Sequence, residues 1–524
     1  MSHRWPTATA LLLAVAAAAP APAQRVQYPQ TRTVDQVDDY HGTRVADPYR
    51  WLEDLDSPET AAWVKAQNGV TFGYLAALPG RDALKQRLTE VWNYPRVSIP
   101  FREGGRLFFT RNTGLQRQSP YFATKPGASS IVGEALVLDP YALSPDGSVS
   151  LSLFAPDPSG RYFAYGLSQG GADWRTVKVR RLADGQDLPD TIEWIRYSGV
   201  SWTKDGEGFF YTRYPAPPRE AGKTLSTASR DPKVYYHRLG TPQSADVAIF
   251  SYPKEPTWGV GAGVSEDGRW LFAYVNRGTD PENQLYVADL GDAKKPNVRA
   301  PLVPVDTTLA AAFAHVGVVG KTAYVYTNLG APKYAVVAVD LTRPARADWK
   351  TVLPETPHTL ESASLVGGKL IAHRLVDVKA EVTIHDLAGK PLATLPLPGI
   401  GSLAGLSGRE ASPELFFGFT SYTVPATIFR TDLAGARPAA TATTFFKPDV
   451  PFDPSQFETR QVFVTSRDGT RVPMFVTHKK GIALDGNNPT ILYAYGGFNI
   501  SQTPGFSTST LPWLEMGGVY AVAN

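Results

Sequence analysis

The sequence predicts a mixed fold, in which a seven-bladed β-propeller lies between the two segments of an incomplete α/β domain. Three observations predict it. Helical patterns come first in the chain of 524 residues, strand patterns with a repeat of about 50 residues follow, and apolar strands typical of a buried α/β sheet come last. Hydrophobic residues make up 43% of the chain, which excludes a disordered or fibrous protein.

The composition excludes several classes of function. The chain has no cysteine, so disulfides, cysteine-based metal sites and thiol catalysis are absent. Its 52 Lys and Arg balance 49 Asp and Glu, which gives no electrostatic case for binding nucleic acid. The eight histidines form no close ligand pair, and no phosphate loop or dinucleotide fingerprint occurs. We therefore expect no metal and no cofactor.

Residues 1–23 have the pattern of a secretory signal peptide. Arg4 precedes an apolar run over residues 8–19, and Ala21-Pro22-Ala23 matches a cleavage site before Gln24. An apolar N-terminal helix or anchor is the alternative, although the run is short for a membrane span. No later stretch has 18 consecutive apolar residues. We therefore expect a periplasmic or secreted protein without a membrane span.

Residues 24–97 form the predicted N-terminal helical segment. Ser57-Pro58-Glu59 is a helix start, because serine caps the helix, proline suits its first position and glutamate faces the positive end of the helix dipole. A second helix carries apolar residues at helical spacing, which predicts a buried stripe. These residues are Leu84, Leu88, Val91 and Trp92.

Residues 98–445 are predicted to form the propeller, because short strands there alternate with turns and a unit recurs. In each unit a turn precedes an aromatic or aliphatic strand. The turns contain Gly105, Gly160, Gly206, Gly268, Gly320 and Gly368, and a weaker seventh unit begins at Ser412. The pair Asp-Leu ends a later strand at 289–290, 340–341, 386–387 and 432–433. Seven units of about 50 residues match four-stranded propeller blades, whereas a pair of β-sandwiches would not need this period.

One apparent catalytic motif is better explained as a hairpin. Residues 166–170, Gly-Leu-Ser-Gln-Gly, fit the G-x-S-x-G nucleophile elbow, which requires a strand, a tight turn and then a helix. The alternating residues 173–179 that follow instead predict a second strand.

Residues 446–524 contain apolar strand runs at 461–465, 472–477, 489–495 and 519–523. Such runs are typical of an α/β sheet with helices on both faces. A sheet of this kind needs more strands and helices than about 80 residues supply. The chain is therefore expected to stop within this domain.

Residues 491–501, Ile-Leu-Tyr-Ala-Tyr-Gly-Gly-Phe-Asn-Ile-Ser, resemble the prolyl oligopeptidase family of serine peptidases. Segments along nearly the whole mature chain agree in order, at 40–42, 47–53, 112–116, 162–168, 173–174, 468–475 and 478–481. The resemblance implies an α/β-hydrolase domain, formed by the N-terminal and C-terminal segments and capped by a seven-bladed propeller. Tyr-Gly-Gly-Phe-Asn resembles the proline-specific branch, whereas the oligopeptidase B branch usually has Tyr-Gly-Ser-Tyr.

The resemblance also implies roles for residues. Tyr495 would donate its phenolic O–H to an oxyanion hole, Phe498 would line a proline pocket, and Gly496 and Gly497 would let the backbone approach substrate. Tyr493 is expected in the core by strand alternation.

In the family a Ser–Asp–His triad acts through an acyl-enzyme, in the chain order Ser, Asp, His. The resemblance places all three after residue 524, so the chain alone is expected to be inactive. It implies short proline-containing peptides as substrates, a propeller that filters them by size, and a monomer. Two alternatives remain open: a non-catalytic propeller that binds peptides or scaffolds partners, and an oligopeptidase of different P1 preference.

Overall fold

The computed structural model describes residues 26–55, 57–216, 229–435 and 442–524. The predicted signal peptide and its cleavage site before Gln24 lie outside these residues. The chain divides into two compact units, with the boundary between Lys85 and Gln86. In the described part of the chain, no helix is long and apolar enough to cross a membrane.

The first unit contains a hairpin of β1 (Val37–Tyr40) and β2 (Thr43–Ala46), the short helix η1 (Arg50–Glu53) and the long helix α1 (Pro58–Ala76). The predicted helix start is confirmed. The Ser57 side chain accepts a hydrogen bond from the Glu59 N–H at 3.2 Å, and Pro58 is the first helical residue.

Helix α2 (Arg81–Trp92) crosses the boundary between the units. Its predicted buried stripe is partly wrong, since Leu84 is 41% exposed and Trp92 42% exposed. Only Val91 is fully buried, because it packs against Phe457 and the residues Leu511 and Leu514 of a later helix.

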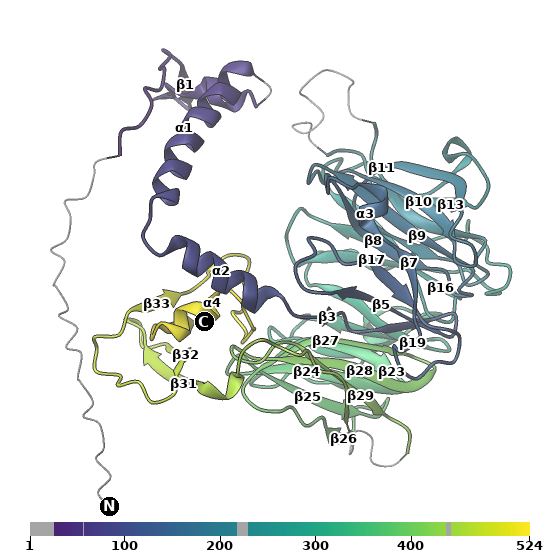
Figure 1. Ribbon diagram of the computed structural model, residues 1–524. Helices are drawn as coiled ribbons and strands as arrows, with labels where there is room; N and C mark the ends of the chain where they lie inside the picture. Colours follow the sequence, from purple (N-terminus) through teal and green to yellow (C-terminus); the bar gives the residue numbers. More distant parts are fainter. Residues whose placement is uncertain (1–25, 56, 217–228, 436–441) are drawn as a thin grey trace, which may run out of the picture. The chain divides into compact units, whose positions relative to one another are not determined.

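Within the described residues, the second unit contains a propeller of seven four-stranded blades (Figure 1). Blade 1 contains β4 (Phe101–Glu103), β5 (Arg106–Asn112), β6 (Tyr121–Ala123) and β7 (Ala135–Leu138), with β3 (Arg96–Val97) also paired to β5. Blade 2 contains β8 (Val149–Pro156), β9 (Tyr162–Gln169), β10 (Arg175–Arg181) and the first half of β11 (Asp187–Trp202). Blade 3 contains the second half of β11, then β12 (Gly208–Arg213), β13 (Lys233–Arg238) and β14 (Val247–Ser251).

The remaining blades are regular antiparallel sheets of consecutive strands. Blade 4 contains β15 (Gly259–Val264), β16 (Trp270–Asn276), β17 (Asn283–Asp289) and β18 (Val303–Asp306). Blade 5 contains β19 (Phe313–Val319), β20 (Thr322–Thr327), β21 (Ala335–Asp340) and β22 (Lys350–Leu353). Blade 6 contains β23 (Thr359–Val366), β24 (Lys369–Val376), β25 (Lys379–His385) and β26 (Pro391–Thr394). Blade 7 contains β27 (Ser402–Arg409), β28 (Ser412–Thr420), β29 (Thr427–Asp432) and β30 (Thr443–Phe446). The connections hold the short helices α3 (Pro140–Leu143), η2 (Gln243–Ala245) and η3 (Arg346–Asp348).

The sequence repeat corresponds to the first turn of each blade. All six repeat glycines lie between the first and second strands with φ between 63° and 83°, and Ser412 begins the second strand of blade 7. These turns abut around the ring: a Cβ added to Gly104 would lie 2.5 Å from the Gly160 backbone in blade 2. Residues 166–170 fall in the β9–β10 hairpin, so the rejection of a nucleophile elbow is also confirmed.

Neighbouring blades bury their apolar faces against each other. The largest such cluster joins Trp270 and Phe272 of blade 4 to Phe313 and Val325 of blade 5, and all four side chains are buried. Each blade has two faces of this kind, so only a closed ring covers them all.

Residues 454–524 form a smaller mixed sheet (Figure 1, yellow-green to yellow). It contains η4 (Pro454–Gln456), β31 (Phe457–Thr465), β32 (Arg471–Lys479), β33 (Thr490–Tyr493), α4 (Thr510–Glu515) and β34 (Val519–Ala523). The strand order is β31-β32-β34-β33, and β33 runs parallel to β34. Phe475 and Val522 of this sheet pack with Val378 and Tyr422 from turns of blades 6 and 7.

A buried histidine between two carboxylates stabilises blades 2 and 3. His237 Nε2 lies 2.9 Å from Asp190 and Nδ1 lies 2.7 Å from Asp246, with all three side chains fully buried. Burial alone would lower the pKa of His237, but the hydrogen bonds to Asp246 and Asp190 outweigh it and raise the pKa above 6.5. This interaction is complete below pH 6.5 and weakens as the pH rises through the raised pKa.

We predict that His237→Ala lowers the free energy of unfolding by about 3–5 kcal/mol at pH 6, because two buried carboxylates lose their partner. The loss should be smaller at pH 9, because the interaction weakens as the pH rises through the raised pKa of His237. Urea unfolding at both pH values measures it, with the half-buried His358→Ala as the control. A loss below about 1 kcal/mol at pH 6 would contradict the prediction.

Candidate active site

The candidate site is the loop that follows β33. Strands β33 and β34 are parallel, with Tyr493 opposite Val522, so both end at the same edge of the sheet. In open α/β sheets, ligands bind in the crevice outside the carboxyl ends of such strands. The loop after β33 is tied to the end of β34, since the Gln502 N–H donates to the Asn524 side-chain oxygen at 2.6 Å. The sheet topology therefore places the loop where α/β enzymes carry their sites.

Tyr495 and Gly497 are brought together in this loop. A Cβ added to Gly497 would lie 2.7 Å from the Tyr495 hydroxyl oxygen, so the phenol lies directly against the glycine backbone. Tyr495 is 45% exposed and its O–H can meet a ligand from solvent. Gly496 differs, since a Cβ there would meet no atom within 4 Å. Of the two predicted glycines, only Gly497 must lack a side chain for the Tyr495 phenol to lie where it does.

Phe498 faces solvent and is not enclosed in a pocket. Its side chain is 75% exposed, and it adopts a left-handed backbone with φ of 54°, as does Asn499 with φ of 55°. Non-glycine residues seldom adopt this region, and such residues cluster at functional sites. The loop is thus held in an uncommon conformation that turns Phe498 outward.

The expectation that Tyr493 lies in the core is wrong, since the side chain is 44% exposed. Alternation predicts burial only for a strand whose face is covered, and β33 is the edge strand of the described sheet. Its neighbours Ile491 and Leu492 are exposed as well.

In the described part of the chain, no serine hydroxyl is hydrogen-bonded to a histidine ring. His237 bonds to two aspartates, His385 to Thr383 and the Gly389 carbonyl, and His478 to the Lys479 carbonyl. The described residues also contain no group of three or more His, Asp or Glu that could hold a metal ion. The site as described can donate a hydrogen bond to an anionic oxygen, but contains no activated nucleophile.

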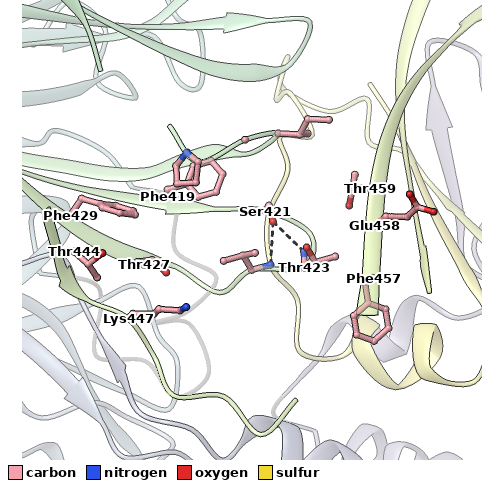
Figure 2. A pocket seen from close by; sticks show the side chains of 14 residues that line it. Phe419, Ser421, Thr423, Thr427, Phe429, Thr444, Lys447, Phe457, Glu458 and Thr459 are labelled. Carbon is pink, nitrogen blue, oxygen red and sulfur yellow. Dashed lines mark hydrogen bonds between the residues drawn. The ribbon is translucent and has the colours of Figure 1, made fainter. Parts of the chain in front are cut away.

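The sequence did not predict a cavity of about 460 Å³ between blade 7 and β31 (Figure 2). Phe419 and Phe429 line it from the propeller, and Phe457 and Glu458 from β31. Ser421 beside them accepts hydrogen bonds from the N–H groups of Thr423 and Val424, so its hydroxyl oxygen is used by the turn. The walls come from four separated stretches at 398–400, 419–429, 444–447 and 457–459, so no local pattern could indicate the cavity. Its walls combine aromatic rings with Lys447 and Glu458, so it can hold a small group that has apolar and polar parts.

Comparisons with known proteins agree with this architecture. A family model described as "Prolyl oligopeptidase, N-terminal beta-propeller domain" matches residues 29–442. The chain is 37% identical over 499 residues to a prolyl endopeptidase of Elizabethkingia meningoseptica, covering 95% of this chain and 68% of that protein. It is 34% identical over 530 residues to prolyl oligopeptidase A of Amanita bisporigera, again covering 95% and 68%.

Solved structures give the same result. A chain from a structural and mechanistic study of two prolyl endopeptidases has a TM-score of 0.87 and 37% identity, and the match covers 95% of this chain and 71% of that chain. Prolyl oligopeptidase B from Galerina marginata, bound to a 35mer hydrolysis and macrocyclization substrate, has a TM-score of 0.87 and 30% identity with the same coverage.

We predict that Gly497→Ala displaces the Tyr495 phenol, because its methyl group would overlap the hydroxyl, whereas Gly496→Ala leaves the phenol in place. Both variants should keep the free energy of unfolding within about 1 kcal/mol, as expected for positions outside the core. Crystal structures of both variants measure the effect. An unmoved Tyr495 ring in Gly497→Ala would contradict the prediction.

Proposed function

This chain belongs to the prolyl oligopeptidase family, and from that premise we propose that it is the propeller-bearing part of a serine endopeptidase that cleaves short peptides after proline. The observation that carries the proposal is the half-exposed Tyr495 just after the carboxyl end of β33, with its hydroxyl against Gly497. A propeller that only binds partners has no need of a hydrogen-bond donor at this edge of an α/β sheet.

In the proposed mechanism a serine attacks the carbonyl carbon of the proline residue. A histidine takes the serine proton and returns it to the leaving amine, while an aspartate orients the histidine and stabilises its charged form. Tyr495 donates its O–H to the oxygen that becomes negative, beside a backbone N–H next to the nucleophile. The described residues assemble no such triad, so all three groups would lie outside them, and residues 1–524 alone would be inactive.

The peptide is held by groups around the same loop. Phe498 offers an aromatic face, which suits the flat, apolar ring of proline, and its 75% exposure leaves that face available. The propeller excludes folded proteins and admits short peptides. The enzyme acts as a monomer in the periplasm or outside the cell, to which residues 1–23 direct it.

Reading the coding DNA beyond the codon for Asn524 tests the proposal directly. We expect a G-x-S-x-G elbow, then an aspartate and then a histidine, in this order. A stop codon at that point would overturn hydrolysis by this protein. The propeller would then be better explained as a peptide-binding module.

We predict that Tyr495→Phe, in the protein that contains the triad, lowers kcat about 10²–10³-fold, the usual effect of losing one oxyanion donor. KM should change little, because the hydrogen bond forms mainly in the transition state. Tyr493→Phe is the matched control, since this tyrosine is equally exposed two residues earlier. A chromogenic peptide with proline at P1 measures both variants, and equal kcat values for the two would contradict the role of Tyr495.

A further inference from the structure

The cavity between blade 7 and β31 has no part in the proposed reaction. Its volume of about 460 Å³ lies within the range of about 300–1,000 Å³ that is usual for sites that bind small molecules. Among the described residues that line it, none belongs to the loop that carries Tyr495. The chemistry of its own walls therefore determines what it can bind.

Three aromatic walls of this cavity are fixed by packing outside it. The Phe419 ring lies against the backbone of Gly401, where an added Cβ would lie 2.3 Å from the ring. Phe429 stacks on Phe417, with ring centroids 5.3 Å apart. Phe457 is buried against helix α4. The walls are thus in place before a ligand arrives, and they favour a flat apolar ring.

One charged group on the wall is unpaired. Lys447 follows the last residue of β30, and its side chain has no hydrogen bond or ion pair within the described parts of the chain. The Glu458 carboxylate, by contrast, pairs with Arg460 at 3.0 Å and points away from blade 7 (Figure 2). The uncompensated charge at the cavity is therefore positive, which favours a ligand with an anionic group.

We propose that this cavity binds a small aromatic carboxylate, whose ring lies between the phenylalanine walls and whose carboxylate pairs with Lys447. Blade 7 provides Phe419 and Phe429, and β31 provides Phe457. The bound ring contacts both elements and so ties the C-terminal sheet to blade 7. This binding goes beyond the proposed peptidase activity and needs no catalytic group.

Three ligands that share one ring system and differ in charge test the proposal. They are 2-naphthoate, the neutral 2-naphthamide and the cationic 2-naphthylmethylammonium, and calorimetric titration measures their affinities at pH 7. We expect 2-naphthoate to bind roughly fivefold or more tightly than the amide, as for one ion pair with an exposed lysine. The cation should bind most weakly of the three.

Lys447→Gln tests the ion pair. This variant should lower the affinity for 2-naphthoate to that for 2-naphthamide, while the affinity for the amide stays unchanged. Lys350→Gln is the matched control, since this exposed lysine lies in β22 and does not line the cavity.

A side chain that fills the cavity tests its location. Thr444 lines the cavity from β30, so Thr444→Phe should abolish the binding of 2-naphthoate and 2-naphthamide alike. Thr443→Phe is the matched control, because this neighbouring exposed threonine is not part of the wall. Thr423→Phe blocks the cavity from the opposite end of the blade 7 sequence and serves as a second filling variant.

Hydrogen exchange tests the contact that the ligand makes between blade 7 and β31. With 2-naphthoate at about ten times its Kd, amides of β31 that exchange only when this strand leaves blade 7 should exchange about tenfold more slowly, by mass action. The amides of blade 4, which does not line the cavity, are the internal control.

Thermal unfolding shows whether each variant is folded. Equal affinities for 2-naphthoate and 2-naphthamide, or an affinity for 2-naphthoate that Lys447→Gln leaves unchanged, would overturn the carboxylate. Binding that survives in both folded filling variants, or no binding of any of the three ligands, would overturn the site. An unchanged exchange rate of β31 would overturn the tie to blade 7. None of these measurements depends on peptide cleavage, so their failure is distinguishable from failure of the proposed function.

Discussion

The structure depends on one constraint: a blade has two apolar faces, and only another blade on each side covers both. Six of the junctions follow the chain from one blade to the next. The seventh junction joins the first blade to the last, and no strand of the described residues belongs to both of these blades. Arg102 instead pairs with Glu414 at 2.7 Å, and Glu103 pairs with Arg409 at 2.6 Å. Charged side chains therefore complete a ring whose other junctions follow the order of the sequence.

The propeller could be predicted because each blade repeats the same short sequence patterns. The repeat glycines mark a turn that needs positive φ, and the Asp-Leu pairs mark a third strand whose leucine is buried at Leu290, Leu341 and Leu433. Both signals lie within a few residues. The shared strand β11 could not be predicted, because its bend lies at a register shift between Ile195 and Val200, and Ser198-Gly199 there is a turn signal that argues against one continuous strand.

The candidate site could be predicted less completely. The sequence indicated the loop around Tyr495, and the seat of this tyrosine on Gly497 gives the pattern a physical reason. The burial predicted for Tyr493 and for the stripe on α2 was wrong, because periodicity shows which side chains share a face but not whether that face is covered.

Strand β11 has a mechanical consequence for the ring. Its 16 residues serve as the last strand of blade 2 and the first strand of blade 3, which makes one continuous seven-stranded sheet of the two blades. Parting them would require rupture of a backbone hydrogen-bond ladder, whereas blades 6 and 7, for example, are joined by isolated backbone hydrogen bonds such as the one from the Gly367 N–H to the Arg409 carbonyl. Blades 2 and 3 should consequently deform as one stiff sector, and the compliance of the ring is concentrated in the junctions outside it.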